Sequence, residues 1–441
     1  MTVTSLVGLP LAVPAAHERA SKLFAGYTRF AAFFEPKSNG GGISAAGTVD
    51  DRNPVAVDFD AAGAGVTSGF TVAIAFEFGP APPQATRGAI DKVQTKIVLR
   101  IGRQIRLCTI TMSPRIIQVD AERPEKEPIA EAVEVLRDGG LVAFPTETVY
   151  GLGARAFDGV SVARIFSAKG RPATHPIIAH VLDEEGARLL AADWSALSSD
   201  LARAFWPGPL TIIAPKRTGV PVELTGGGDS VGIRAPAHPV ARALIAALGE
   251  PIAAPSANRF QQISPTLAAH VVKSLGDAVD LVLDGGACVH GIESTVISIS
   301  SAGEIHLLRP GSITIAQLRT HAPVIYESRI VADNARRDSP GLDAKHYAPR
   351  ARLVLAARDR LSAMAAAMQG NVGLILSDKL AGSRAFAVHV LSDDPEHFAS
   401  GLFAALHDLD DRNCDVILVE EPPSDDAWIA VRDRLGRASE K

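Results

Sequence analysis

The feature that most constrains the fold is an alternation of apolar strands and amphipathic helices that begins near residue 128. Residues 128–140 place a proline in the first turn, apolar side chains on one face and two glycines at the end, which predicts a helix. A buried strand is expected at 141–144. The alternation continues until two runs, 294–300 and 304–311, predict an antiparallel pair. This pattern predicts an α/β domain with a largely parallel or mixed sheet.

A second unit is expected beyond a polar stretch at 326–350, whose prolines and glycine favour a linker. Residues 351–441 contain three further apolar strands and three helical patterns, which predicts a small three-layer, Rossmann-like α/β domain. The length of 441 residues exceeds what one hydrophobic core usually supports and is consistent with two or three domains.

The first 111 residues differ from the rest. They are rich in Gly, Pro and Ala, and only 70–78 and 95–102 have the pattern of strands. We predict that residues 1–111 form a poorly ordered extension, and we hypothesise that the functional protein starts near Met112. The apolar N-terminal run has no basic segment before it, so a signal peptide is not favoured, and no apolar run is long enough for a spanning helix.

Net charge and cysteine content exclude or disfavour several classes of protein. A net charge of -5 argues against nucleic-acid binding through a globally basic face, although a local basic cleft stays open. Cys108, Cys288 and Cys414 are far apart and form no CxxC pair, which disfavours disulfides and zinc and favours reduced thiols in the cytoplasm. The signatures of P-loop, zincin, hydrolase-elbow and dinucleotide-binding proteins are missing from the sequence.

Two stretches carry most of the chemistry. FPTETVYGLG at 144–153 contains two threonines, a glutamate and a tyrosine directly after a buried strand. This loop is therefore expected to line a site rather than only to reverse the chain. Lys169 and Arg171 flank a glycine before a proline and suit the oxygens of a polyphosphate. Cations that complement the dipole of a helix C-terminus would explain this pair as well.

Other polar residues follow predicted strands, where ligands of α/β sheets bind. Taken singly, each serine or asparagine could be a turn residue, and a histidine at a strand end could be a core residue. Together with four cations at strand or helix ends they indicate one site. The residues are Lys169, Arg171, His180, Ser230, Arg234, Ser256, Asn258, Ser264, Ser294, Thr295 and Arg309.

Nine motifs now occur in a recognisable order: FPTETVYGLG, AKGRP, PIIAH, VGIRAPAHP, APSAN, ISPT, STVISI, LLRPG and SPGLDAKHYAP. From about Met112 onward the chain resembles the threonylcarbamoyl-AMP synthases of the YrdC-like family, in their two-domain form. The resemblance implies a YrdC-like catalytic domain with a twisted mixed sheet at 112–325, a linker or lid at 326–350, and a C-terminal domain at 351–441. It also implies a nucleotidyltransferase that converts L-threonine, bicarbonate and ATP into L-threonylcarbamoyladenylate and pyrophosphate. A separate tRNA threonylcarbamoyl transferase would use the product.

The resemblance assigns roles to individual residues. It implies that Tyr150 and the nearby glycines shape the wall, and that Mg²⁺ arrives with ATP, held mainly by phosphates and water. Glu147 is given a structural role in preference to a metal-binding one, because ligand carboxylates usually come in groups. No residue stands out as a general base. L-Threonine is assigned to Thr148, His180, Arg234 and Ser294, and ATP to Lys169, Arg171, His175, Ser230, Ser256, Asn258, Ser264, Arg309 and Tyr347.

The chain departs from the family pattern at three places. In the linker, Leu342, Asp343 and Ala344 replace a methionine, a lysine and a tyrosine, and Asp343 reverses a charge. Gln261 and Gln262 stand where a Ser-Gly pair is common, and His175 stands where asparagine is frequent.

Two other classes stay open. One is a non-catalytic RNA-binding protein on the same fold, which would use the cationic cleft to bind tRNA or double-stranded RNA. The other is a carbamoyl-transferring maturation factor, which would normally carry zinc-finger modules that this cysteine-poor chain cannot build. No membrane partner is expected.

Overall fold

The computed structural model describes residues 114–326, 346–379 and 385–439, and the backbone of six strands between residues 30 and 109. The chain divides into two compact units, Met1–Met112 and Ser113–Lys441, which are described separately. The altered linker positions 342–344 lie outside the described residues.

The first unit contains two antiparallel three-stranded sheets. The strands expected at 70–78 and 95–102 coincide with β4 and β5, and the other four strands were not predicted because their short runs do not alternate clearly. The poor order and dispensability of residues 1–111 stay predictions. The strands are β1 (Phe30–Phe34), β2 (Ile43–Gly47), β3 (Val57–Asp60), β4 (Phe70–Phe76), β5 (Thr95–Ile101) and β6 (Gln104–Thr109).

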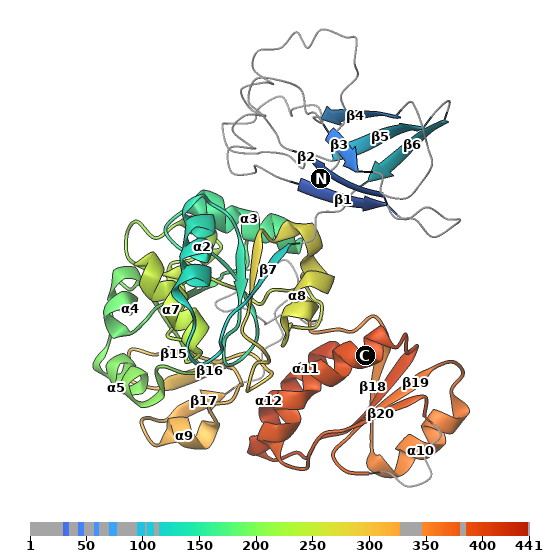
Figure 1. The fold of residues 1–441 in the computed structure, drawn as a ribbon. Coiled ribbons are helices and arrows are strands. Elements are labelled where there is room, and N and C mark those ends of the chain that lie inside the picture. Colours follow the sequence, from blue (N-terminus) through green and yellow to red (C-terminus); the bar gives the residue numbers. More distant parts are fainter. Residues whose placement is uncertain are drawn as a thin grey trace. The chain divides into compact units, whose positions relative to one another are not determined.

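An eleven-stranded mixed sheet dominates the second unit, in the order β17-β16-β15-β11-β12-β10-β13-β9-β8-β14-β7. Figure 1 labels the edge strand β7 and, toward the other edge, β15, β16 and β17. The predicted mixed sheet and the antiparallel pairing of β15 with β16 are confirmed. The strands β7, β9 and β17 were not predicted. The strands are β7 (Arg115–Gln118), β8 (Val142–Phe144), β9 (Gly151–Arg155), β10 (Ile178–His180), β11 (Leu210–Pro215), β12 (Ser230–Arg234), β13 (Ile252–Ala253), β14 (Leu281–Asp284), β15 (Thr295–Ile299), β16 (Ile305–Arg309) and β17 (Val324–Tyr326).

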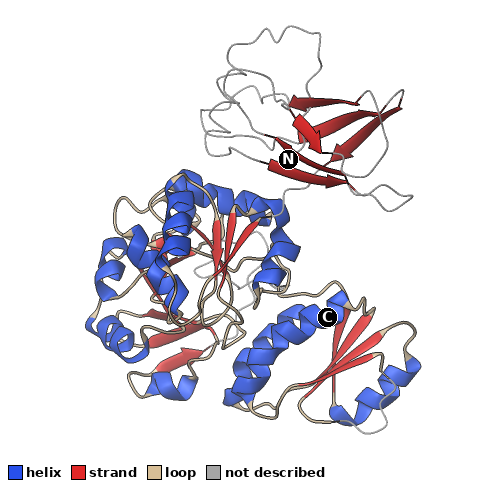
Figure 2. Ribbon diagram, viewed as in Figure 1, coloured by secondary structure: helices blue, strands red, loops and turns tan. Residues whose placement is uncertain are grey.

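Helices cover this sheet (Figure 2). The helix predicted at 128–140 begins slightly earlier, and its apolar face, Ile129, Val133 and Leu136, is buried as the pattern requires. Asp158 caps α3 by accepting from the N–H groups of Val160 and Ser161. The helices are α2 (Lys126–Arg137), α3 (Gly159–Lys169), α4 (Glu184–Leu190), α5 (Ala196–Phe205), α6 (Val222–Thr225), α7 (Pro239–Leu248), α8 (Ala268–Leu275) and α9 (Ile315–Arg319).

Pairing between strands decides which motifs meet. β10 and β12 are parallel neighbours, and His180 lies opposite Arg234 in their register. The carboxyl ends of two separate motifs, PIIAH and VGIRAP, therefore emerge side by side. Gly153 serves packing inside the sheet, because a Cβ there would lie 2.8 Å from a ring carbon of Phe144 and 3.0 Å from a methyl of Ile252.

The C-terminal part is a parallel four-stranded sheet in the order β18-β21-β19-β20, with α10 on one face and α11 and α12 on the other (Figure 1). The predicted three-layer α/β domain is confirmed, and β20 is a strand that the sequence pattern missed. The elements are β18 (Arg352–Ala356), α10 (Arg358–Ala367), β19 (Val372–Leu376), β20 (Ala387–Val390), α11 (Pro395–Asp411), β21 (Val416–Glu420) and α12 (Ile429–Ala438).

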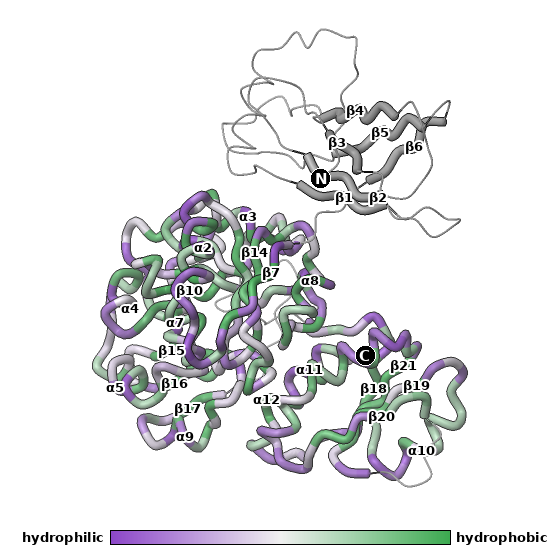
Figure 3. Tube along the Cα trace, viewed as in Figure 1, coloured by the Kyte–Doolittle hydropathy of each residue, from purple (hydrophilic) through white to green (hydrophobic). Residues whose placement is uncertain are grey.

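The hydrophobic core does not stop at the linker. Hydrophobic segments gather in the strands, while loops and the outer turns of helices are mostly hydrophilic (Figure 3). One core cluster joins Val149, Ile263 and Ile292 to the C-terminal residues Phe398 and Phe403. The C-terminal helices therefore share apolar packing with the segments that carry the site motifs. Among the described residues, no helix combines the length and apolar character needed to cross a membrane.

Candidate active site

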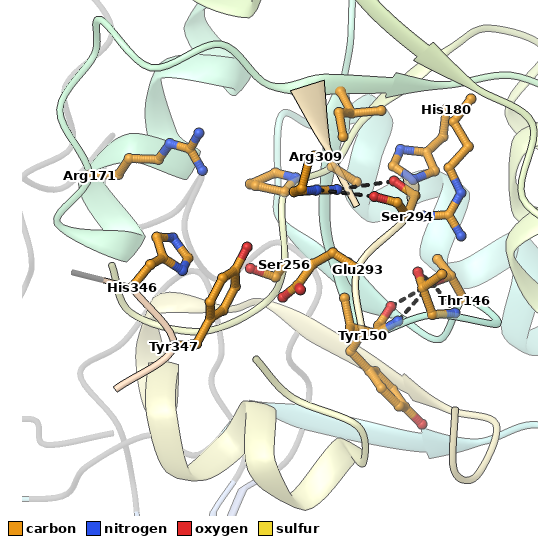
Figure 4. Close-up of a pocket in the computed structure, with 17 residues that line it drawn as sticks. Thr146, Tyr150, Arg171, His180, Ser256, Glu293, Ser294, Arg309, His346 and Tyr347 are labelled. Carbon is orange, nitrogen blue, oxygen red and sulfur yellow. Dashed lines mark hydrogen bonds between the residues drawn. The ribbon is translucent and has the colours of Figure 1, made fainter. Parts of the chain in front are cut away.

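A pocket opens where the ends of β8, β10, β12, β13 and β16 meet the start of β15 (Figure 4). Among the described residues that line it are three arginines, Arg171, Arg234 and Arg309, and one carboxylate, Glu293. A wall with this charge balance suits an anionic ligand. Two of these strands, β10 and β12, are parallel neighbours, and ligands of α/β sheets often bind beyond the carboxyl ends of such strands.

The threonine-rich loop after β8 is held by its own hydroxyl groups. Thr146 Oγ1 donates to the carbonyl of Val149 at 2.6 Å and accepts from the N–H groups of Thr148 and Val149, both at 3.2 Å. Thr148 Oγ1 lies 2.8 Å from Thr146 Oγ1. Because the hydroxyl hydrogen of Thr146 is already used, the Thr148 hydroxyl donates to Thr146 and keeps lone pairs for the pocket.

Tyr150 has a structural role in the same loop. Its hydroxyl donates to the carbonyl of Gly286 at 2.7 Å and lies 3.3 Å from a carboxylate oxygen of Asp284. Figure 4 shows its phenol directed away from the other labelled residues. Tyr150 therefore fixes the loop and contributes the pocket wall by its position.

Glu147 and Arg234 form a buried ion pair. Arg234 Nη2 donates to Glu147 Oε1 at 2.7 Å, and the N–H of Ala237 donates to Glu147 Oε2 at 3.0 Å. Burial acts to raise the pKa of Glu147, but the charge and hydrogen bonds of Arg234 hold it below its usual range. Both carboxylate oxygens of Glu147 thus accept hydrogen bonds from the protein, as expected for a structural residue. The ion pair also orients the Arg234 guanidinium at the pocket wall.

His180 is neutral at physiological pH. Burial, and then the neighbouring charge of Arg234, lower its pKa to about 3. Its ring lines the pocket and meets Phe144 edge to face, with centroids 6.3 Å apart. His180 can therefore act there as a neutral hydrogen-bonding group.

Ser294 joins two strands of the site. Arg309 donates through Nε to the carbonyl of Ser294 and through Nη2 to its hydroxyl, both at 3.1 Å (Figure 4). The same hydroxyl lies 2.8 Å from Thr211 Oγ1 on β11. Burial lowers the pKa of Arg309. This arrangement fixes Arg309 and Ser294 relative to each other before any ligand binds.

The two cations of the AKGRP motif have different positions. Arg171 lines the pocket and donates through Nη2 to the carbonyl of Pro176 at 2.9 Å. Lys169 is buried, and its ammonium donates to the carbonyls of Ser256 and Asn258. Burial, and then the charge of Arg171, hold the pKa of Lys169 well below its usual range. Lys169 thus anchors the APSAN loop from behind the pocket.

Of the next four predicted nucleotide residues, one lines the pocket and three do not. Ser256 lines it, whereas Asn258 uses Nδ2 to donate to the carbonyls of Arg259 and Gln262. The Ser264 hydroxyl donates to Glu293. His175 packs edge to face against Phe260.

Ser230 is separated from the site by the length of a strand. It begins β12, whose last residue is Arg234, so about 13 Å of extended chain lies between Ser230 and the pocket end of the strand. The structure therefore brings Thr148, Arg171, His180, Arg234, Ser256, Ser294, Arg309 and Tyr347 to the pocket wall, and leaves Lys169, His175, Ser230, Asn258 and Ser264 off it.

Tyr347 forms part of the wall from the linker side. It has a left-handed backbone conformation with φ of 61°, is buried, and its hydroxyl has no hydrogen-bond partner among the described residues. Burial raises the pKa of Tyr347 to about 12, so the hydroxyl stays protonated. Figure 4 shows Tyr347 beside His346, with Ser256 and Glu293 next to it.

Sequence reasoning missed three residues. Thr146 and Glu293 line the pocket beside predicted residues, and their position next to Thr148 and Ser294 in the motifs was the available signal. Arg434 is fully buried and contacts Glu293. In the last helix, Arg434 lies on the same face as Val431 and Leu435. An arginine on an otherwise apolar helix face was the feature of the sequence that could have revealed its buried position.

Comparison with known proteins supports one family. A family model described as "Telomere recombination" matches residues 134–311, and one described as "Threonylcarbamoyl-AMP synthase, C-terminal domain" matches residues 313–440. A protein of Pyrococcus abyssi (strain GE5 / Orsay) named threonylcarbamoyl-AMP synthase is 40% identical over 334 residues, which cover 72% of this chain and 96% of the relative. The chain belongs to the threonylcarbamoyl-AMP synthase family.

Other relatives agree with this assignment. A Bacillus subtilis (strain 168) threonylcarbamoyl-AMP synthase is 37% identical, with 73% of this chain and 96% of the relative covered. The crystal structure of P. abyssi Sua5 complexed with L-threonine superposes with a TM-score of 0.68 and 39% identity, covering 74% of this chain and 97% of that chain. The predicted fold class and family are confirmed, and the chain is an enzyme of this family.

Proposed function

We propose that the chain catalyses the reaction that gives the family its name. L-Threonine, bicarbonate and ATP are the substrates, and threonylcarbamoyl-AMP and pyrophosphate are the products. The observation that carries the proposal is a family match over nearly the whole length of the relatives, together with a pocket that gathers all four predicted threonine residues. That P. abyssi Sua5 was crystallised with L-threonine supports the choice of amino acid.

The threonine side of the pocket consists of Thr148, His180, Arg234 and Ser294. Arg234 binds the carboxylate of the amino acid, because its guanidinium is oriented by Glu147 and a fork of N–H groups matches two carboxylate oxygens. Thr148 Oγ1 accepts from a donor of the substrate, since its own hydrogen is used by Thr146. Neutral His180 adds a hydrogen-bonding group without a second positive charge.

The reaction depends on positioning of the substrates and does not require a protein nucleophile. The neutral amine of threonine attacks bicarbonate, a nitrogen–carbon bond forms, and water leaves to give a carbamate anion. A carbamate oxygen then attacks the α-phosphate of ATP, and the bond to the β-phosphate breaks to release pyrophosphate. Arg171 and Arg309 are placed to neutralise charge on these phosphates, and enclosure of the carbamate limits its loss as CO₂.

Magnesium enters this scheme as part of the substrate Mg·ATP. Among the described residues, no group of three or more His, Cys, Asp or Glu side chains is arranged to hold a metal ion. Glu293, the carboxylate at the pocket wall, already accepts from Ser264 and Arg434. We therefore place the ion on phosphate oxygens and water. We also propose that the enzyme works in the cytoplasm and passes its product to a tRNA-modifying transferase.

The test is pyrophosphate release by the full chain given ATP, magnesium and bicarbonate, with and without L-threonine, and with L-serine as a decoy. Release that depends on threonine and is at least about tenfold weaker with serine is the expected result, since the pocket must recognise one methyl group. Release that no amino acid stimulates, combined with salt-sensitive binding of tRNA, would favour the RNA-binding class instead. A chain starting at Met112 with unchanged activity would support the proposed start of the functional protein.

A further inference from the structure

The C-terminal helix α12 buries a charged side chain beside the pocket. The guanidinium of Arg434 is fully buried, and Nε donates to Glu293 Oε2 at 2.7 Å. Nη1 donates to Asp433 at 2.7 Å, and Nη2 donates to the carbonyl of Pro310 at 3.0 Å. Burial acts to lower the pKa of Arg434, but Tyr347, Glu293 and Asp433 raise it, so the group stays charged.

Such a residue is costly for stability alone. Removing an ion from water costs several kcal/mol, and apolar residues of similar size often replace buried ion pairs without loss. The apolar packing of α12 through Val431 and Leu435 would dock the helix without any charge at position 434. Docking of α12 therefore does not explain why a buried arginine with several hydrogen bonds occupies position 434.

One set of bonds leads from Arg434 to Ser264. Glu293 holds Arg434 through Oε2 and accepts the Ser264 hydroxyl through Oε1. The backbone carbonyl of Ser264 lies 3.1 Å from Nε2 of His407 on α11. Two C-terminal helices thus fix the ISPT segment, one through its hydroxyl and one through its carbonyl.

A second set of contacts leads from Arg434 to Tyr347. The Arg434 Cζ atom lies 5.2 Å from the centroid of the Tyr347 ring, a cation–π distance, and Phe403 of α11 stacks on the ring at 5.6 Å. The N–H of His346 donates to the carbonyl of Arg437 at 3.1 Å. These contacts hold Tyr347 in a left-handed conformation that costs about 1–2 kcal/mol for a residue with a side chain.

We infer that Arg434 is a positioning residue for the nucleotide half of the site, acting through Glu293 on Ser264 and through ring contact on Tyr347. The C-terminal domain is then part of the active site rather than a separate module. The inference rests on the proposed function, because it assumes that the pocket residues Tyr347 and Glu293 lie on the ATP side. No described contact of Arg434 reaches the side chains of Thr148, His180, Arg234 or Ser294. Its link to the threonine side is a 3.4 Å contact with the carbonyl of Glu293, so threonine recognition should change less than ATP binding.

The experiment compares Arg434→Lys with Arg432→Lys in the full chain. Lysine keeps the charge that Glu293 needs but has no planar fork to bond Pro310, Asp433 and Glu293 together. Arg432, two residues away on the same helix, bonds the carbonyls of Pro423 and Asp425 outside the pocket and is the matched control. We expect Arg434→Lys to raise the KM for ATP about tenfold and to change the KM for threonine less than about twofold. Arg432→Lys should leave both unchanged.

A double-mutant cycle with Tyr347→Phe separates positioning from simple stability. If Arg434 acts by placing the Tyr347 hydroxyl, Arg434→Lys should have a clearly smaller effect on the KM for ATP in the Tyr347→Phe background. Effects that multiply independently would remove the Tyr347 part of the inference. If Arg434→Lys does not fold, Glu293→Gln tests the same chain of contacts from the other end and should raise the KM for ATP severalfold.

The outcomes keep this inference apart from the proposed function. Equal loss in both KM values, or unchanged kinetics in Arg434→Lys and Glu293→Gln, would overturn the inference while wild-type turnover still supports the synthase. Absence of threonine-dependent turnover in the wild-type chain would instead overturn the proposed function. Thermal unfolding of every variant shows whether a change in KM accompanies a change in stability.

Discussion

The two halves of the pocket are built in different ways. The proposed threonine side comes from neighbouring strand ends of one sheet, with His180 opposite Arg234 in register and Thr148 held by Thr146. The proposed nucleotide side includes the linker residue Tyr347 and depends on contacts with two C-terminal helices. The first half is local to the main sheet, and the second depends on long-range packing. Substitutions should therefore affect the two halves differently.

The largest effect is expected for Arg234→Met. It removes the proposed partner of the substrate carboxylate and leaves Glu147 buried without its cation, so kcat/KM for threonine should fall by about 10²–10³-fold and stability by about 3–5 kcal/mol. Adding Glu147→Gln should recover much of the stability but not the activity. Steady-state kinetics and denaturant unfolding measure the two, and full recovery of activity in the double variant would contradict the assignment of Arg234.

The AKGRP cations offer a sharper comparison within the nucleotide side. Both Arg171→Ala and Lys169→Ala should lower ATP-dependent turnover, by about 10²-fold for Arg171, which lines the pocket. Lys169→Ala should lower the unfolding midpoint more than Arg171→Ala, because it leaves two carbonyls, those of Ser256 and Asn258, without their donor, whereas Arg171 donates to the carbonyl of Pro176. Pyrophosphate release and thermal unfolding test this, and wild-type-like rates in both variants would refute the nucleotide assignment.

A moderate effect is expected for Tyr347→Phe. The hydroxyl has no hydrogen-bond partner among the described residues, so its removal should leave the unfolding midpoint unchanged within experimental error. If the hydroxyl binds the nucleotide, the KM for ATP should rise severalfold, as for the loss of one hydrogen bond, while the KM for threonine stays constant. A change in the KM for threonine alone would contradict the assignment of Tyr347 to ATP.

The smallest effect concerns pH and the contact between α8 and α11. His270 and His407 stack with ring centroids 3.8 Å apart, and burial lowers their pKa to about 3 and about 4. Near pH 6 the unfolded chain binds more protons than the folded chain, so these groups make stability fall as pH decreases from about 6.5 to about 4. Each contributes at most about 1.4 kcal/mol per pH unit.

His407→Gln is the variant that tests this pH dependence. It removes one titrating ring and leaves an amide that can still donate to the Ser264 carbonyl, so the slope of the unfolding free energy between pH 6.5 and 5 should become smaller. An unchanged slope would mean that other groups, such as the buried His180 or His346, govern the response.

Sequence patterns predicted the elements whose formation depends on neighbouring residues in the chain. Periodicity located most helices and strands from α2 onward, because burial of one helix face and alternation along the chain are local properties. It missed β9, since Gly151 and Gly153 have no side chain to contribute to a strand pattern, and it missed β20, a short edge strand with exposed Val388 and Val390.

The sequence by itself determined the fold class and the family, because these depend on ordered motifs at the ends of regular elements. Only the tertiary structure decided that Lys169 faces backbone carbonyls, that Ser230 lies at the far end of β12, and that Arg434 reaches Glu293. The physical reason is distance along the chain. Arg434 and Glu293 are 141 residues apart, and no local pattern in the sequence shows which buried charge will meet which partner in the folded chain.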